Sequence, residues 1–158
     1  MTQEIIEGKK APAFTMPTDG SGSVSLKDFS GKKLVMFFYP KDSTPGCTTE
    51  SVEFSQNLSK FRRAGADVLG VSRDSVASHD KFKLKQGLKI TLASDADTNV
   101  IDTYGSWVEK NNYGRKYMGI ERSTFLIDES GKIIRIWRKV RVKGHVADVL
   151  ATVKELKE

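Results

Sequence analysis

The chain of 158 residues contains a single cysteine, Cys47, and only two histidines. One cysteine cannot form an internal disulfide, and neither histidine has a second metal-binding residue at a suitable spacing. The sequence therefore excludes a disulfide-stapled fold and predicts no metal site, and we expect His79 and His145 at the surface or in capping positions. A lone thiol fits a reducing cytoplasm better than an exported environment, so we predict a cytoplasmic protein.

Long hydrophobic runs are also missing. No apolar stretch approaches the ~20 residues of a membrane span, and residues 1–7 have neither the cationic nor the apolar region of a secretory signal. Repeats, low-complexity tracts and long linkers are absent too, which predicts one domain over residues 1–158. With 38% hydrophobic and 29% charged residues, the composition is that of a soluble globular protein without a membrane partner.

Acidic residues are outnumbered, 20 against 26 lysines and arginines, and the formal net charge is +6. Part of the excess lies in residues 132–142, where Arg135, Lys139 and Arg141 would share one face of a strand. A protein that binds nucleic acid or an acidic partner without a catalytic thiol is one alternative, and it predicts indifference to Cys47→Ser. The stacking aromatics and zinc-finger spacing of nucleic-acid readers are missing, so we expect a solvated sheet face and no nucleic-acid partner.

Hydrophobic periodicity and turn residues predict an α/β protein with helices on both faces of a sheet. A hairpin is expected over 14–26, with its tip at Thr18–Ser23, and Lys110–Lys116 is expected to be an exposed mobile loop. Further strands are predicted over 34–39, 66–72, 90–93, 123–127 and 132–142, and helices over 48–64, 76–86, 100–104 and 146–156.

Cys47 lies between the apolar strand 34–39 and the helix 48–64. A helix N-terminus favours negative charge, and the thiolate is the reactive form of cysteine. Ligands of such sheets bind at the carboxyl ends of the strands. A buried structural cysteine is the alternative, but a turn at Pro45-Gly46 and a polar first helical turn after Cys47 favour a reactive thiol.

The pattern Pro40-x-x-x-Thr44-x-x-Cys47-Thr48, with Glu50 beyond it, closely resembles that of peroxiredoxins. The segments Tyr104–Trp107, Lys116–Ile120, Arg122–Asp128 and Val142–Val146 are similar to the bacterioferritin comigratory protein branch, the Q-type peroxiredoxins. This resemblance covers nearly the whole chain from Gly8 onward. It implies a thioredoxin-like fold with a central mixed sheet flanked by helices and an N-terminal hairpin. It also implies a thiol peroxidase that reduces hydrogen peroxide and organic hydroperoxides with no cofactor, neither metal nor flavin.

The resemblance also assigns roles to site residues. Cys47 would attack a peroxide oxygen as thiolate and become sulfenic acid. The Thr44 hydroxyl would orient the peroxide and the thiolate, and Pro40 would shield the thiolate from water. Arg122 matches the family arginine, whose cation stabilises the thiolate and polarises the peroxide.

Two further residues would support this site. Backbone N–H groups near Gly46 could stabilise charge on the leaving oxygen, in the manner of an oxyanion hole. Glu50 would either hold Arg122 in place or act on the helix dipole, and the sequence leaves these roles open. We expect Trp107 to be a packing residue, although family members place it close to the site, where it would line the rim.

A second, resolving cysteine is missing. Many members of the branch carry one five residues after the first, which here is Val52, or on a later helix. The sequence Thr44-Pro45-Gly46-Cys47 also excludes a Cys-x-x-Cys dithiol cycle. We therefore predict a one-cysteine peroxidase, which is expected to be a monomer. Its sulfenic acid would be reduced by an external thiol, either glutathione, a glutaredoxin or a thioredoxin-type protein.

Overall fold

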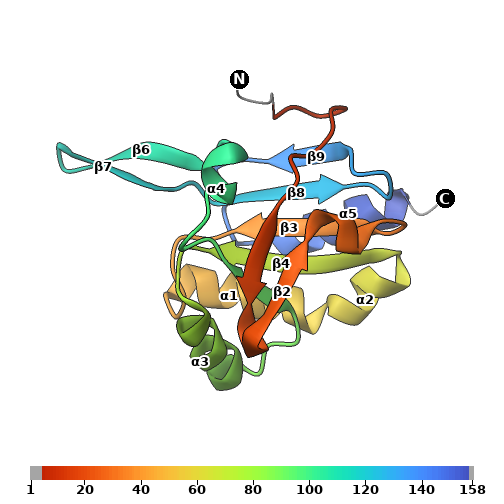
Figure 1. Cartoon of the computed structure of the whole chain (residues 1–158), viewed down its shortest axis with the longest axis horizontal. Coiled ribbons are helices and arrows are strands. Elements are labelled where there is room, and N and C mark those ends of the chain that lie inside the picture. The colour runs from red at the N-terminus through yellow and green to blue at the C-terminus, as the bar shows by residue number, and fades with distance from the viewer. Residues whose placement is uncertain (1–4, 157–158) are drawn as a thin grey trace.

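A mixed sheet with the strand order β2-β1-β5-β4-β3-β8-β9 forms the centre of the computed structural model, which describes residues 5–156 (Figure 1). Residues 1–4, part of the segment predicted not to be a signal, lie outside the described residues. No helix within residues 5–156 is long and apolar enough to cross a membrane. The strands are β1 (Thr15–Thr18), β2 (Gly22–Ser25), β3 (Lys33–Phe38), β4 (Ala66–Ser72), β5 (Thr91–Ser94), β8 (Ser123–Ile127) and β9 (Ile133–Trp137).

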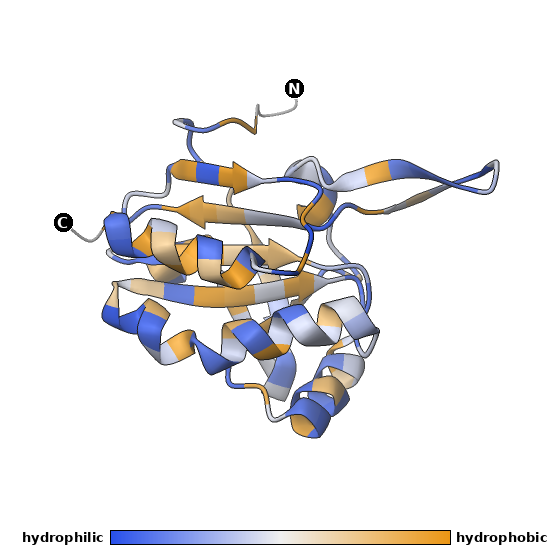
Figure 2. Cartoon of the chain, turned by 180° about the vertical axis from the view of Figure 1, so that it is seen from behind, coloured by the Kyte–Doolittle hydropathy of each residue, from blue (hydrophilic) through white to orange (hydrophobic). Residues whose placement is uncertain are grey.

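Both faces of this sheet are covered, which explains why β3 is apolar at successive positions. Val35 and Phe37 pack into one hydrophobic cluster, and Leu34 and Met36 pack into the other. Figure 2 shows the apolar strands behind amphipathic helices. The first cluster takes side chains from α1 (Pro45–Gln56), α2 (Leu58–Arg63), α3 (Val76–Gln86) and α5 (His145–Glu155), and the second from α4 (Val100–Thr103) and the 3-10 helix η2 (Leu26–Phe29).

The predicted α/β arrangement with an N-terminal hairpin is confirmed. Strands β1 and β2 pair antiparallel, and their tip is the short 3-10 helix η1 (Asp19–Ser21). The bounds of β4, α3 and β8 are those that the sequence predicts. Helix α3 ends where Gly87 adopts a left-handed conformation with φ of 64°, a position that favours glycine.

The predicted helix over 48–64 is wrong in its bounds, because the structure contains two helices there. Helix α1 begins earlier, at Pro45, and Asn57 separates it from α2. The Asn57 side chain donates to the Glu53 carbonyl at 2.8 Å, an asparagine side chain competing for the helical backbone. The earlier start places Cys47 inside the first turn of the helix.

The predicted strand over 132–142 is also too long. Strand β9 ends at Trp137, and Lys139 has φ of 48°, in the left-handed region, which extended chain does not use. The strand therefore ends at Trp137, although charged and apolar residues still alternate in the sequence beyond it. After that point the backbone turns toward Arg122, whose carbonyl accepts a hydrogen bond from Val140 N–H at 3.0 Å.

The segment Lys110–Lys116, predicted to be a loop, is the tip of a second antiparallel pair, β6 (Trp107–Asn112) and β7 (Arg115–Ile120). Tyr113 and Gly114 both have positive φ, 54° and 82°, as a two-residue hairpin turn requires. This hairpin projects from the main sheet in Figure 1. Because most of its side chains are exposed, its sequence lacks the alternation that marks a half-buried strand.

The sheet topology determines which residues meet at one edge. Strands β3, β4 and β5 are parallel, so their carboxyl ends lie at the same edge of the sheet. Strand β8 runs antiparallel to β3 and pairs Phe38 with Ser123. Its amino end therefore lies at that edge too, and Arg122, which precedes β8, sits beside the chain that leaves β3 toward Cys47.

Candidate active site

Cys47 is the third residue of α1 and only 1% exposed. Pro45 occupies the first helical position, where its missing N–H costs nothing. The first hydrogen bond at this helix end runs from Thr48 N–H to the Thr44 carbonyl, at 2.8 Å. Helix geometry therefore leaves the N–H groups of Gly46 and Cys47 without an intrahelical partner. They supply partial positive charge beside the sulfur.

Arg122 joins Cys47 to Glu50. Its Nη2 donates to Cys47 Sγ at 3.2 Å, and its Nη1 donates to Glu50 Oε1 at 2.5 Å. Burial acts to lower the pKa of Arg122, but the negative charges of Glu50 and Cys47 outweigh it and raise that pKa above its usual value. The guanidinium is thus a fixed cation in direct contact with the sulfur, placed to stabilise negative charge there.

Glu50 is fully buried, at 0% exposure, and lies one turn along α1 from Cys47. Burial raises its pKa to about 7, although the charge of Arg122 acts in the opposite direction. Its second oxygen, Oε2, has no hydrogen-bond partner among the described residues. The sequence left open whether Glu50 holds Arg122 in place or acts on the helix dipole. In the structure Glu50 is in direct contact with Arg122.

Gly46 leaves room for the guanidinium. A Cβ atom at this position would lie 3.3 Å from Arg122 Nη2 and 4.0 Å from Val142 Cγ2. The first of these distances is tighter than an ordinary van der Waals contact. A side chain here would push Arg122 away from Cys47, so Gly46 supports the site through its lack of a side chain as well as through its N–H group.

Thr44 and Pro40 lie on the loop that leads to Cys47. Thr44 is half-buried at the helix N-cap, but its hydroxyl donates to the Lys41 carbonyl at 2.8 Å instead of capping the helix. The lone pairs of the hydroxyl remain able to accept a hydrogen bond. Pro40 is exposed, and with Trp107 it lines a shallow hollow beneath the β6–β7 hairpin.

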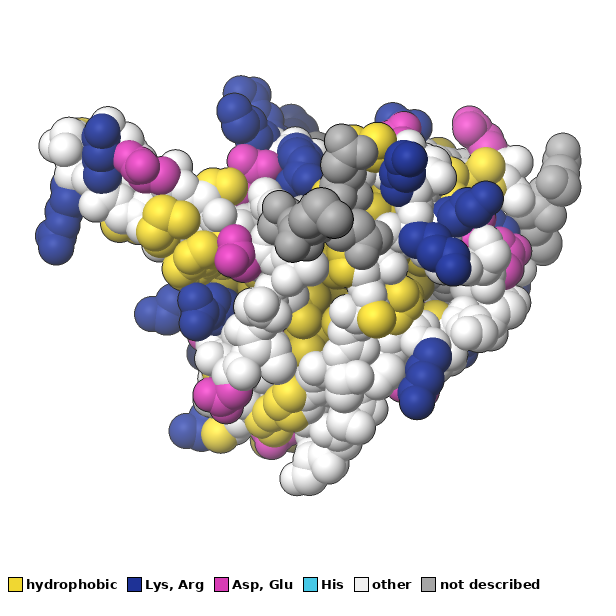
Figure 3. Space-filling model, turned by 45° about the horizontal axis from the view of Figure 1, so that its top comes forward, with side chains coloured by type: hydrophobic (Ala, Val, Ile, Leu, Met, Phe, Trp, Pro, Cys, Tyr) yellow, Lys and Arg dark blue, Asp and Glu magenta, His cyan; other side chains and the backbone are white. Residues whose placement is uncertain are grey.

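This hairpin carries basic and hydrophobic side chains together, as Figure 3 shows at the end of the projecting arm. Tyr113, Tyr117 and Met118 are its exposed large hydrophobic residues. Trp107 stacks on Arg73, whose guanidinium carbon lies 4.7 Å from the ring centroid. The hollow therefore has an apolar floor and a cation at its border.

A second buried polar network lies under the same loop, and the sequence analysis missed it. Asp42 Oδ1 accepts from the Tyr39 hydroxyl at 2.6 Å, and Oδ2 accepts from Ser78 Oγ at 2.8 Å and from His79 Nδ1 at 2.7 Å. His79 Nε2 lies 3.0 Å from the Ala93 carbonyl. The two ring nitrogens of His79 thus connect Asp42, on the loop after β3, to the Ala93 carbonyl of β5.

The predicted surface or capping position of His79 is therefore wrong, because this side chain is 0% exposed. One signal for burial was available: His79 and Phe82 lie three residues apart, on one face of α3, and both are buried. No pattern in the sequence relates His79 to Asp42, which lies 37 residues earlier.

The predicted position of His145 at the surface is also wrong. This residue begins α5 but is 7% exposed, and its Nε2 lies 2.7 Å from Thr124 Oγ1. Burial lowers the pKa of His145 to about 4, and the nearby charge of Arg122 acts in the same direction, against Asp148. His145 is therefore neutral at neutral pH and adds no positive charge to the site.

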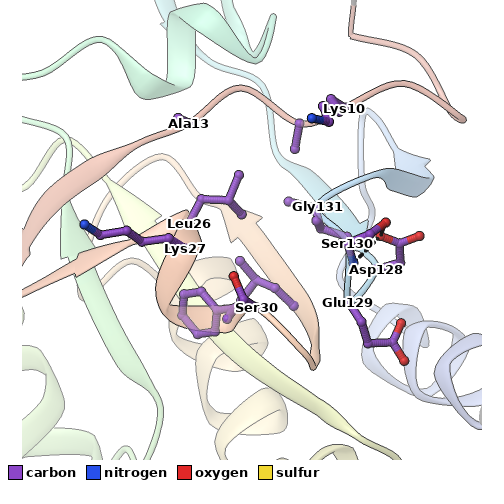
Figure 4. A pocket seen from close by; sticks show the side chains of 13 residues that line it. Lys10, Ala13, Leu26, Lys27, Ser30, Asp128, Glu129, Ser130 and Gly131 are labelled. Atoms are coloured by element: carbon purple, nitrogen blue, oxygen red, sulfur yellow. Dashed lines mark hydrogen bonds between the residues drawn. The ribbon is translucent and has the colours of Figure 1, made fainter.

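Another hollow, of about 290 Å³, lies at the opposite end of the sheet (Figure 4). Leu34, at the start of β3, and Ile127, at the end of β8, line it, whereas Cys47 follows the other end of β3. Asp128 there accepts hydrogen bonds from Ser130 within its own turn. This hollow contains none of the predicted site residues. Residues 5–156 hold no group of three or more His, Cys, Asp or Glu side chains placed to bind a metal.

This chain is similar to known proteins over most of its length. The model of the AhpC/TSA family matches residues 7–136. The peroxiredoxin Bcp of Bacillus subtilis is 47% identical over 158 residues, which cover 100% of this chain and 99% of that protein. The chain is also similar to two solved structures with the same thioredoxin-like fold, which confirms the predicted fold.

The first is the bacterioferritin comigratory protein of Xanthomonas campestris, solved in trapped intermediate/ligand complexes related to its alkyl peroxide reduction activity. It is 46% identical, with a TM-score of 0.88 and 92% of each chain covered. The second is a cysteine-to-serine mutant of the PrxQ of Xylella fastidiosa, which is 40% identical. Its TM-score is 0.89, with 100% of this chain and 98% of that chain covered.

Proposed function

Because the chain belongs to the AhpC/TSA family and is a peroxiredoxin of the Bcp, or Q, type, we propose that it reduces hydrogen peroxide and organic hydroperoxides through a sulfenic acid at Cys47. As a peroxiredoxin it is a thiol peroxidase. Support for organic hydroperoxides as substrates comes from the similar Xanthomonas campestris protein, which has alkyl peroxide reduction activity. The proposed setting is the cytoplasm, with the chain acting as a monomeric single domain.

The observation that carries this proposal is the 3.2 Å contact between Arg122 Nη2 and Cys47 Sγ at the first turn of α1. The Cys47 thiolate attacks one peroxide oxygen, the sulfur–oxygen bond forms and the oxygen–oxygen bond breaks. Arg122 and the free N–H groups of Gly46 and Cys47 stabilise the charge that moves onto the leaving oxygen. In this proposal the Thr44 hydroxyl accepts a hydrogen bond from the peroxide O–H and orients the substrate, and Pro40 limits access of water.

The single cysteine determines how the cycle closes. We propose that an external thiol attacks the sulfenic sulfur, releases water and forms a mixed disulfide with Cys47. A second thiol then attacks this disulfide, regenerates Cys47 and leaves as the oxidised reductant. Glutathione, a glutaredoxin and a thioredoxin-type protein all supply this chemistry.

The alternative of a basic binding protein loses part of its support. Two arginines of residues 132–142 contact other groups of the fold. Arg138 Nη2 donates to the Tyr104 carbonyl at 3.2 Å, and the Arg135 guanidinium lies 4.9 Å from the Trp137 ring centroid. These contacts favour a packing role for the two side chains.

Stopped-flow tryptophan fluorescence with hydrogen peroxide and with an alkyl hydroperoxide tests the first half-reaction. We expect rapid single-turnover oxidation that Cys47→Ser abolishes. Intact-mass analysis with a sulfenic-acid trap should find one adduct, on Cys47. Oxidation no faster than that of a free thiol would overturn the peroxidase proposal for this chain.

The reductant is tested separately, by mixing the preformed sulfenic acid with glutathione, with a glutaredoxin and with a thioredoxin. The expected result is a mixed disulfide at Cys47 followed by recovery of the free thiol with at least one of them. A sulfenic acid that none of the three reduces would contradict resolution by these thiols while leaving the first half-reaction intact.

A further inference from the structure

Glu50 has an incomplete set of partners in the part of the chain that the structure describes. Its Oε1 receives Arg122 Nη1, whereas its Oε2 is buried with no hydrogen-bond partner. Ser51 Oγ, next along α1, is likewise buried and unpartnered. Buried carboxylates normally satisfy both oxygens, so an orphan oxygen on a fully buried glutamate requires an explanation.

The charges around Glu50 explain its unpartnered oxygen. Arg122 is a single cation in contact with two acids, the Glu50 carboxyl and the Cys47 thiol. If both acids were ionised, one buried negative charge would lack a full counter-charge, which is costly. The helix N-terminus offsets only about half of a charge, and it does so at Cys47.

The other titratable groups that face Glu50 do not supply the missing charge. Glu53, on the same helix, adds a like charge that raises the pKa of Glu50 further. His145, from α5, has a pKa of about 4 because of its burial and is neutral. Arg122 therefore balances one negative charge on the pair formed by Glu50 and Cys47. Of these two acids, only Cys47 lies at the helix N-terminus as well as in contact with Arg122.

We propose that Glu50 holds a proton while Cys47 is a thiolate, and that it gives the proton up when Cys47 is oxidised. Glu50 is then the proton reserve of the half-reaction. Before oxidation the ion pair is Cys47 with Arg122, and after oxidation it is Glu50 with Arg122. Glu50 acts through Arg122 and does not touch the peroxide.

With Glu50 as the proton donor the half-reaction balances in atoms and charge. This inference rests on the proposed peroxidase function. A protonated Glu50, the Cys47 thiolate and ROOH give ionised Glu50, Cys47 sulfenic acid and ROH. The sulfur is oxidised by two electrons and the oxygen–oxygen bond is reduced. The peroxide proton stays on the sulfenic oxygen, and the alkoxide that leaves receives a proton whose net source is Glu50. No proton is taken from the solvent.

Counting protons tests this inference. The wild-type protein is oxidised with one equivalent of alkyl hydroperoxide in weak buffer containing a pH indicator, about one pH unit below the pKa of about 7 of Glu50. We expect almost no proton uptake from solution in the wild type and one proton per oxidised Cys47 in Glu50→Gln. Glu109→Gln, an exposed glutamate of the β6–β7 hairpin, is the control and should behave as the wild type does.

Infrared difference spectroscopy of the wild type keeps the inference testable if Glu50→Gln does not fold. The carbonyl band of a protonated carboxyl group should be present in the reduced protein and disappear on oxidation. Oxidation with one proton taken up by the wild type, or without a change in this band, would overturn the role of Glu50 alone. Absence of oxidation would instead overturn the peroxidase function.

Discussion

Two buried polar networks contact the segment of residues 40–50, and they differ in how many of their polar atoms have hydrogen-bond partners. Around Asp42, both carboxylate oxygens and both nitrogens of His79 have partners. Around Arg122, Glu50 Oε2 has none within the described chain. The network around Asp42 has all these hydrogen bonds, and it fixes the loop. The network around Arg122 lacks a partner at Glu50, and it keeps a charge available for chemistry.

We expect the largest effect from a substitution in the network around Asp42. His79→Leu removes the ring whose nitrogens lie 2.7 Å from Asp42 Oδ2 and 3.0 Å from the Ala93 carbonyl, and it leaves both buried oxygens without this partner. A buried polar group that loses its partner costs about 1–3 kcal/mol, so we expect a loss of about 2–6 kcal/mol in the free energy of unfolding measured with urea. Lys81→Ala, an exposed site on the same helix, is the control. A loss in His79→Leu no larger than in this control would show that the network does not stabilise the loop.

The next largest effect is expected from a substitution in the network around Arg122. Arg122→Ala removes the only side-chain cation found against Cys47 Sγ among the described residues. We expect the rate constant for peroxide reduction to fall by about 100–1000-fold, as when a donor to a developing negative charge is removed. Competition with a second peroxidase measures this constant. Arg138→Ala, which removes a different arginine at the edge of the sheet, should leave it almost unchanged, and equal losses in both variants would contradict a specific role for Arg122.

A pH series of unfolding measurements sharpens the comparison, because Glu50 and His145 act in opposite directions. The pKa of Glu50 rises from 4.5 to about 7 on folding, so its contribution to stability is present at low pH and is lost as pH rises toward 7. The pKa of His145 falls from 6.5 to about 4, so its contribution is present above pH 6.5 and is lost as pH falls toward 4. Each is worth about 3 kcal/mol across its range.

In the wild type these two contributions largely cancel between about pH 4.5 and 6.5. Relative to the wild type, Glu50→Gln should gain stability as pH rises through this range, and His145→Gln should lose it. Urea midpoints at several pH values measure both trends. Parallel curves for all three proteins would mean that neither group changes its proton affinity on folding.

The smallest effect is expected from removing one hydrogen-bond donor from the network around Asp42. Tyr39→Phe deletes the hydroxyl that donates to Asp42 Oδ1 at 2.6 Å, while the other oxygen keeps Ser78 and His79. A hydrogen bond to a charged group contributes about 2 kcal/mol, so the loss of stability should be smaller than in His79→Leu. Thermal or urea unfolding would show this, and a loss equal to that of His79→Leu would mean that the network fails as a unit.

The sequence predicted the site around Cys47 and Arg122 better than the network of Asp42 and His79, for physical reasons. Cys47 is recognisable because the strand, the turn and the helix start around it are contiguous. Arg122 lies 75 residues away and was assigned by family resemblance, and the pairing of β8 with β3 brings it to Cys47. His79 meets Asp42 only through the packing of α3 against the sheet edge, which no local pattern encodes.

The elements that sequence analysis missed have a related explanation. The β6–β7 hairpin has no extensively buried face, so its side chains show no periodicity. Strand β9 was predicted too long because alternating basic and β-branched residues continue past Trp137, where the chain leaves the sheet to carry Val142 toward Gly46. Tertiary contacts decided both outcomes.

The most direct test of the account is the yield of trapped sulfenic acid at Cys47 after one brief exposure to an alkyl hydroperoxide. Intact mass would be compared between the wild type and Arg122→Ala, both shown to be folded. The account predicts one adduct on Cys47 in the wild type and almost none in the variant at the same mixing time. Equal yields in the two proteins would contradict it, because the contact between Arg122 and Cys47 would then have no part in the chemistry.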